Sequence, residues 1–265
     1  MKRILFSLGI LCLIGYAPIV HGWGIWGHNH INKAAVLALP KEMGMFFYNH
    51  SDFITEESTV PDLRKHMYAD KTEASRHYIN LERFGYESRA GMPKTLQDAV
   101  AKYGKDTMEK HGILPWCIQE MMVKLTKAFK NKNKTEILLL AADLGHYIGD
   151  AHMPLHTSLN HDGQLTGQRG IHAFWEGELP ELFGKTYNLN TEEAHYIKDV
   201  EKATWDILDS SYSLVDRLLA TEKKMRNDNP EDKQYKVGND GKRLKGKLGQ
   251  DVHTYEYAHV YHELL

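Results

Sequence analysis

Residues 137–150 have the sequence ILLLAADLGHYIGD, and this stretch decides the fold class. Its apolar residues recur with the period of a helix, so we predict a helix over 135–150 that opens with Thr135 as its cap. His146 and Asp150 are four residues apart, so a helix would place both side chains on one face, one turn apart. The stretch therefore combines a helical scaffold with two side chains that can bind a metal.

The same periodicity extends over most of the chain. We predict further helices over 29–39, where Pro40 ends the run, and over 41–50, 96–102, 115–130 and 191–220, the last as one helix or two. Alternating runs of β-branched residues, which are typical of strands, are almost absent. The predicted fold is an all-α single domain of many helices.

Four other segments lack a clear period. Residues 50–76 are polar and irregular, with a turn predicted at Pro61-Asp62. Residues 157–170 contain three glycines and are expected to form a loop. Residues 227–247 are polar and charged, which favours a mobile excursion, and residues 255–262 form a final aromatic- and histidine-rich segment.

The first 22 residues are typical of a secretory signal peptide. A short basic head precedes an apolar stretch over 4–19, and residues 20–22 offer a small-residue cleavage site. We therefore expect an exported protein, periplasmic or secreted, with a mature domain over 23–265. The alternative is a signal helix that is retained as a membrane anchor.

Charge and cysteine content limit the possible classes further. The chain has 33 Lys+Arg and 35 Asp+Glu, and because the signal holds only Lys2 and Arg3, the mature net charge is about −4. Binding of a polyanion would therefore need a local basic patch. Cys12 lies in the signal and Cys117 is the other cysteine, so the mature chain cannot form an internal disulfide. A lipoprotein cleaved at Cys12 is disfavoured because Leu11 is bulky.

A second pair of side chains repeats the spacing of His146 and Asp150. His172 and Glu176 are also four residues apart, and His156 lies between the two pairs. One such pair is often a surface ion pair, but two pairs that flank a glycine-rich loop indicate a metal site, and neutral imidazole with carboxylate suits Zn²⁺. Trp23, at the expected mature N-terminus, would add a free amine five residues before His28.

Two candidates lie upstream of these pairs. Taken alone, Asp62 is more often the cap of a turn, and His77 is more often a half-buried histidine of a helix. Their assignment as metal ligands depends on a resemblance that several motifs carry together.

Five motifs resemble, in the same order, those of the bacterial zinc-dependent phospholipases C and the single-strand-specific zinc nucleases. They are WGIWGH (23–28), VPDLRK (60–65), RHYIN (76–80), HYIGDAHMPLH (146–156) and IHAFWE (171–176). The resemblance extends from Trp23 to about Gly184, and beyond it only the helical character is shared. It implies an α-helical fold with three zinc ions in a cleft between helices.

The resemblance also implies how the ligands divide among the three ions. One zinc would be held by Asp62, His77, His146 and Asp150. A second would be held by His156, His172 and Glu176. The third would be held by the Trp23 amine and carbonyl oxygen, His28, and the other oxygen of a bridging Asp150.

The activity implied is hydrolysis of phosphate diesters by zinc-activated water, with Asp150 orienting this water or accepting its proton. Lys65 matches a Lys/Arg position near the cluster of the nucleases, and we expect it to bind the phosphate during catalysis. Tyr78 matches an aromatic position that packs against a base in the nucleases, although an ordinary core tyrosine is an equal alternative. Second candidates for the phosphate, each of which could instead be a surface charge, are Arg64, Arg76 and Arg169.

Three functions are compatible with these residues. We place first a phospholipase C-like enzyme that acts on phospholipid head groups, because it is favoured by Glu176, which is typically Asp in the nucleases, and by the missing disulfides. The step from Trp23 to His28, the run IGDAHMPLH and Tyr78 favour a single-strand-specific nuclease. A non-catalytic exported protein stabilised by zinc is the third. We infer a phosphodiester substrate, no transmembrane span and no protein partner.

Six further histidines are weaker candidates. His30 and His152 lie beside ligand positions. His161 is expected at the rim of the substrate site. A second site could be formed by His253, His259 and His262.

Overall fold

The computed structural model describes residues 24–67, 71–246 and 249–264. The predicted signal peptide and Trp23 lie outside these residues. The predicted all-α class is confirmed, because the described residues pair as strands only in three isolated antiparallel bridges. The longer helices are α1 (Gly24–Ala38), α8 (Leu114–Lys130), α9 (Lys134–Ala151), α12 (Val200–Ser213), α13 (Val215–Asp228) and α15 (Tyr255–Leu264). The shorter ones are α2 (Lys41–Tyr48), α3 (Ser51–Glu57), α4 (Val60–Met67), α5 (Lys71–Ala74), α6 (Leu96–Tyr103), α7 (Lys105–His111), α10 (Ile171–Ala173), α11 (Leu179–Phe183) and α14 (Glu231–Gln234).

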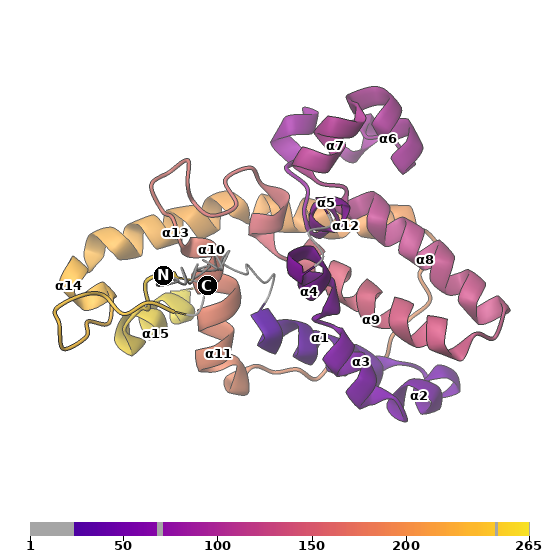
Figure 1. Cartoon of the computed structure of the whole chain (residues 1–265), viewed down its shortest axis with the longest axis horizontal. Helices are drawn as coiled ribbons and strands as arrows, with labels where there is room; N and C mark the ends of the chain where they lie inside the picture. The colour runs from indigo at the N-terminus through magenta and orange to yellow at the C-terminus, as the bar shows by residue number, and fades with distance from the viewer. Residues whose placement is uncertain (1–23, 68–70, 247–248, 265) are drawn as a thin grey trace, which may run out of the picture.

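Helices α8 and α9 form the central hairpin of the fold (Figure 1). Trp116 of α8 meets Trp205 of α12 edge to face at 5.8 Å, and both are buried with Tyr147 of α9. Burying each such ring contributes about 1.5–3 kcal/mol to folding. Helix α9 is capped by Asn133, whose side chain accepts a hydrogen bond from the Glu136 amide, and not by the predicted Thr135, which lies inside the helix.

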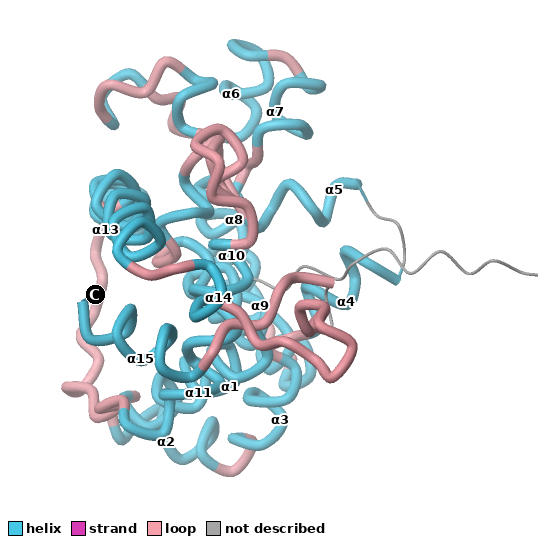
Figure 2. The backbone as a smooth tube through the Cα atoms, turned by 90° about the vertical axis from the view of Figure 1, so that its left-hand side faces the viewer, coloured by secondary structure: helices cyan, strands magenta, loops and turns pink. Residues whose placement is uncertain are grey.

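Helices α1 and α3 also pack on α9. The buried side-chain amide of Asn32 in α1 donates to the carbonyl oxygens of Ile54 in α3 and Ala142 in α9, so one side chain joins three helices. In both views, α2 and α3 lie at the end of the molecule away from α6 and α7 (Figures 1 and 2).

The segment 50–76 differs most from the sequence prediction. It contains α3, α4 and α5 rather than an irregular loop, and Pro61-Asp62 belongs to the first turn of α4 rather than to a separate turn. Proline is favoured at the start of a helix, where its missing N–H has no partner to lose. The same dipeptide is therefore compatible with a turn and with a helix start, and the packing of α4 beside α9 decides for the helix.

The last part of the chain, from residue 191 to residue 264, contains α12 to α15. The helix predicted over 191–220 is two helices, α12 and α13, and residues 191–199 are not helical. After α14, the chain folds back on itself, because the Lys236 amide donates to Val252 and the Leu244 amide donates to Lys236. This backbone pairing gives 227–247 local structure; the predicted mobility of the segment stays a prediction. No helix in the described residues is long and apolar enough to cross a membrane.

Candidate metal centre

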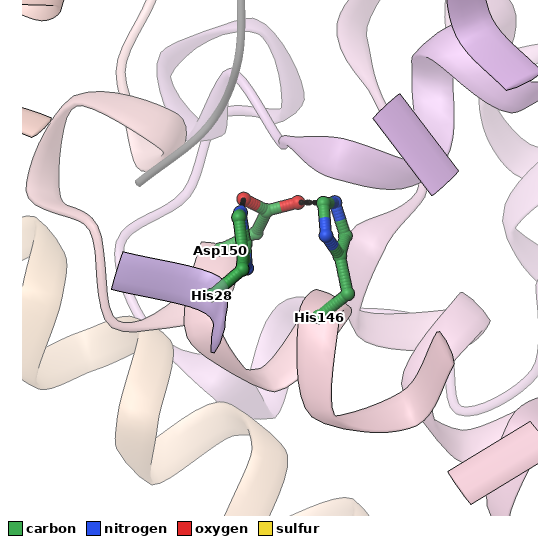
Figure 3. A group of neighbouring side chains, drawn as sticks. All are labelled: His28, His146 and Asp150. Atoms are coloured by element: carbon green, nitrogen blue, oxygen red, sulfur yellow. Dashed lines mark ion pairs between the residues drawn. The ribbon is translucent and has the colours of Figure 1, made fainter. Parts of the chain in front are cut away.

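Helix α9 carries the two side chains around which the candidate site is built (Figure 3). His146 and Asp150 are both fully buried and lie on one face of the helix, as their spacing predicts. The Asp150 Oδ2 atom lies 3.0 Å from Nδ1 of His77 and 3.2 Å from Nε2 of His146. Its Oδ1 atom lies 3.3 Å from Nδ1 of His156 and 3.6 Å from Nε2 of His28. Each oxygen thus faces a different pair of imidazoles, which is the geometry of a bridging carboxylate.

The first group that could hold a metal ion consists of Asp62, His77 and His146, all buried. The His146 Nε2 and His77 Nδ1 atoms are 3.0 Å apart, and Asp62 Oδ1 is 3.6 Å from the same His77 nitrogen. The His146 Nδ1 donates to the Ser58 carbonyl oxygen at 2.7 Å, which directs its Nε2 into the group.

The second group consists of His28, His146 and Asp150. The rings of His28 and His146 stack with centroids 3.8 Å apart. Both ring nitrogens of His28 are buried without a hydrogen-bond partner among the described residues. Burial, reinforced by the charge of His146, lowers the pKa of His28 to about 3, so this imidazole is neutral, the form that binds metals.

The third group consists of His156, His172 and Glu176. A π-helical turn over Phe174–Glu178 follows α10, and the Glu176 carboxylate lies 2.7 Å from His172 Nε2 and 3.4 Å from His156 Nε2. The His172 Nδ1 donates to the carbonyl oxygen of His161 at 2.8 Å, which points Nε2 at Glu176. A π-turn interrupts the helical ladder and is frequent at functional sites.

The donor atoms of these groups fit zinc. Zinc bonds of about 2.0–2.1 Å in a tetrahedron separate two ligand atoms by roughly 3.3 Å. The donor pairs described above are 2.7 to 3.6 Å apart, and all donor atoms within one group lie within 4.8 Å of one another. Imidazole nitrogens and carboxylate oxygens are also the ligands that zinc prefers, and the unpartnered nitrogens of His28 are hard to explain in a buried site without a cation.

The imidazoles and carboxylates of the site shift one another's pKa values. Burial opposes ionisation of Asp150, but the imidazoles of His146 and His156 outweigh it and hold the pKa of this carboxyl well below its usual range. Burial likewise opposes the charge of His156, yet Asp150 and Glu176 raise its pKa to about 10. A divalent cation bound here would offset the charge of these carboxylates in place of a proton on His156.

The two candidate substrate residues lie beside this site. The Lys65 ammonium is 2.8 Å from Asp62 Oδ1 and its side chain is 17% exposed, so it reaches both the cluster and solvent. Burial lowers the pKa of Lys65, but Asp62, Asp150 and Glu176 together raise it above its usual value, so the side chain stays charged at neutral pH. Tyr78 is half-buried and its hydroxyl donates to the Lys110 carbonyl oxygen at 3.1 Å. Burial raises the pKa of the Tyr78 hydroxyl, and the positive charge of Lys65 opposes this rise.

The second candidates for the phosphate are in part committed elsewhere. Arg64 makes two hydrogen bonds to Asp143, and Arg76 pairs with Glu73 at 2.8 Å. Arg169 is exposed and, with His161, lines a pocket of about 430 Å³ beside His172. Of these three arginines, Arg169 is therefore the one whose guanidinium is open to a ligand.

The weaker histidine candidates do not join the three groups. His30 stacks on Trp26, and His152 is exposed, with its Nδ1 on the Ile148 carbonyl oxygen. His253 pairs with Glu178 and packs on Phe174, and no metal-binding group among the described residues contains it, His259 or His262.

Sequence reasoning missed Glu73, which is 1% exposed and lies 3.5 Å from His77 Nε2. The spacing Glu73–His77, again four residues, was the available signal.

The comparison with protein families agrees with this geometry. The S1/P1 nuclease family matches residues 23–236, which is most of the chain and extends well past Gly184, where the motif resemblance ends. No curated protein and no solved structure matches the chain. All eight described ligand candidates fall within the matched range and within the three groups.

Proposed function

The chain belongs to the S1/P1 nuclease family, which makes it a zinc-dependent phosphodiesterase, and from this premise we propose that it cleaves single-stranded nucleic acid. The observation that carries the proposal is the family match over residues whose eight candidate ligands converge on three buried groups. Structural zinc sites are commonly rich in cysteine, whereas these groups contain none, so the third function considered, a non-catalytic zinc protein, is disfavoured.

The ligand assignment is part of the proposal. We assign one zinc to Asp62, His77, His146 and Asp150, and a second to His156, His172 and Glu176. The third would use His28 and the other Asp150 oxygen, together with the amine and carbonyl oxygen of Trp23. The opposed imidazole pairs around Asp150 support its bridging role.

Zinc would supply Lewis acidity, which lowers the pKa of water from near 16 to about 7 and offsets charge on phosphate oxygens. The protein supplies the remaining roles. Asp150, as the carboxylate shared by two of the groups, would orient the attacking water or take its proton. Lys65 would bind a non-bridging phosphate oxygen, and Tyr78 would stack on a base next to the scissile bond.

The family match changes the order of the two substrates considered. A phospholipase C-like activity came first on the strength of Glu176 and the missing disulfides, but the family favours nucleic acid. Glu176 does not decide chemically between the two substrates, because Glu and Asp both offer carboxylate oxygens to zinc.

Export is likewise proposed, from the first 22 residues, and mass spectrometry of the mature N-terminus tests it.

The substrate is tested by assaying purified, zinc-loaded protein on single-stranded DNA, RNA, double-stranded DNA and phosphatidylcholine vesicles. We expect cleavage of the single strands, little cleavage of the duplex, and loss of activity in Asp150→Asn. Hydrolysis of phosphatidylcholine without nuclease activity would replace the proposal with the lipid alternative. A zinc-loaded protein inactive on all four substrates would support the non-catalytic function instead.

A further inference from the structure

Helix α9 carries a second pair of side chains with the same spacing as His146 and Asp150. Asp143 and Tyr147 are also four residues apart and point to α4 and α5 instead of into the metal groups. Arg64 of α4 binds both Asp143 oxygens, at 3.2 and 2.8 Å. The Tyr147 hydroxyl donates a short hydrogen bond to Oε1 of Glu73 in α5.

Glu73 is held from several sides. Besides the Tyr147 hydroxyl, its carboxylate receives Arg76 Nη1 at 2.8 Å and Arg64 Nε at 3.4 Å. The residue is 1% exposed, so removing these donors would leave a buried charge. Its position is therefore fixed by groups from α4, α9 and the 3₁₀ turn at Ser75–His77.

His77 needs an acceptor on the side where Glu73 lies. Its Nδ1 atom faces Asp62, His146 and Asp150, so a metal would bind there and leave the proton on Nε2. That Nε2 is buried and has no hydrogen-bond partner within the described residues, while Oε1 of Glu73 lies 3.5 Å away. This contact is about half an ångström longer than an ordinary hydrogen bond, a gap that a small ring rotation closes.

We propose that Glu73 is a positioning residue that accepts the Nε2 proton of His77 and so presents Nδ1 to the metal. Tyr147, Arg64 and Asp143 keep the Glu73 carboxylate in place, so one helix supplies two metal ligands and the support of a third. This inference rests on the zinc site of the proposed function but not on the nature of the substrate. A carboxylate in this position also raises the basicity of the imidazole ligand.

The alternative is a plain structural role, in which Glu73 only anchors Arg64 and Arg76. Both roles predict that Glu73→Gln lowers the melting temperature. Only the positioning role predicts a loss of zinc affinity and a change at the His77 ring. The two readings are therefore separated by measurements on the metal site and not by stability.

The experiment compares Glu73→Gln, Tyr147→Phe and the control Glu56→Gln, which changes an exposed carboxylate in α3. Zinc affinity is measured by competition with a chromophoric chelator, and the His77 Nε2 proton is followed by ¹H–¹⁵N NMR of zinc-loaded protein. We expect Glu73→Gln to weaken the affected zinc by about 10–100-fold and to move the Nε2 proton upfield. Tyr147→Phe should show a smaller change of both, and Glu56→Gln neither.

Wild-type zinc affinity and an unmoved Nε2 proton in Glu73→Gln would overturn the proposal, even if the melting temperature fell. If Glu73→Gln does not fold, Tyr147→Phe decides, and unchanged values of both quantities in that variant overturn it. Because no substrate is used, a protein that binds zinc but cleaves no nucleic acid would contradict the proposed function and leave this result standing.

Discussion

Lys65 could either hold the candidate ligand Asp62 in place or bind the phosphate of the substrate. Its ammonium is bound to Asp62, a candidate ligand, and its side chain also reaches solvent, where a phosphate would enter. We predict that Lys65→Met lowers kcat/KM on single-stranded DNA by about 10²–10³-fold, the usual effect of removing one donor to the transition state. Zinc content, measured by elemental analysis, should stay at the wild-type value.

Lys65→Arg is the matched control, since it retains the charge and should keep most of the activity. Loss of zinc from Lys65→Met, in proportion to the loss of activity, would mean that Lys65 serves Asp62 and not the phosphate.

Tyr78 tests the stacking role separately from the phosphate. Base stacking on an aromatic ring contributes about 1–3 kcal/mol, so Tyr78→Ala should raise KM for single-stranded DNA by roughly 5–150-fold. Tyr78→Phe keeps the ring and removes only the hydroxyl that bonds Lys110, so its KM should stay near wild type. Steady-state kinetics measure both, and a core tyrosine without contact to substrate would give equal KM values in all three proteins.

The residues of the site were predictable where chemistry and spacing coincide. His146 with Asp150 and His172 with Glu176 follow from helical geometry alone, and the motifs added Asp62, His77 and His28. Glu73 and Tyr147 were not predicted, because their role comes from contacts between α5 and α9, 74 residues apart in the sequence. The four-residue spacing of Glu73 and His77 marks a possible pair, but the burial of this acid and its contact with Tyr147 appear only once the helices are packed.

At the scale of the element, the long helices were predictable, as were the short helices α2 and α6, whereas α3, α4 and α5 were not. The period that marks α8 and α9 needs several turns to appear, and α3, α4 and α5 have only 7, 8 and 4 residues within a polar stretch of sequence. Their stability comes from packing, of α3 and α4 against α9 and of α5 against α4, and not from their own sequence. The predicted loop over 50–76 failed for this reason, although it carries Asp62 and Lys65.

Two glycines that flank α7 offer a test of how the elements hold the site. Both have positive φ, +83° at Gly104 and +93° at Gly112. A Cβ at Gly104 would meet nothing within 4 Å, whereas a Cβ at Gly112 would lie 1.9 Å from the Tyr78 carbonyl oxygen. Gly104→Ala should therefore cost only backbone strain, about 1–3 kcal/mol. Gly112→Ala should cost more and also displace the segment that carries His77 and Tyr78.

Thermal unfolding and nuclease assays of Gly104→Ala and Gly112→Ala test this prediction. We expect a lower melting temperature in both variants and reduced kcat/KM in Gly112→Ala alone. Equal activities would show that the contact between α7 and Tyr78 is not needed to hold the site.

At the scale of the whole molecule, the metal groups lie where α1, α4, α9 and the turn over Phe174–Glu178 meet, so bound zinc would join segments between His28 and Glu176. No disulfide joins these segments within the described residues, where Cys117 is free and buried. We predict that chelation lowers the melting temperature strongly, because a ligand at 1,000 times its Kd stabilises the native state by about 4 kcal/mol per site. Calorimetry with and without chelator measures the effect, and an unchanged melting temperature would contradict it.

The start of the mature chain gives the last prediction. Helix α1 begins at Gly24, and a Cβ there would lie 3.3 Å from the carbonyl oxygen of Glu176, so the helix start is next to a candidate ligand. An α-amino group on Trp23 has an unperturbed pKa near 8, and only its neutral form binds zinc. Cleavage after Gly22 would therefore complete the third zinc site, and a residue joined to Trp23 would remove that ligand by converting the amine to an amide.

We predict about three zinc ions in protein that starts at Trp23, and one fewer in protein with a tag fused before Trp23, together with reduced turnover. A C-terminally tagged protein, processed after Gly22, is the control for the tag itself. Elemental analysis and kinetics on the three preparations measure the difference. Equal zinc content and turnover in the N-terminally extended and processed proteins would remove the amine from the site and leave His28 and Asp150 to hold that ion.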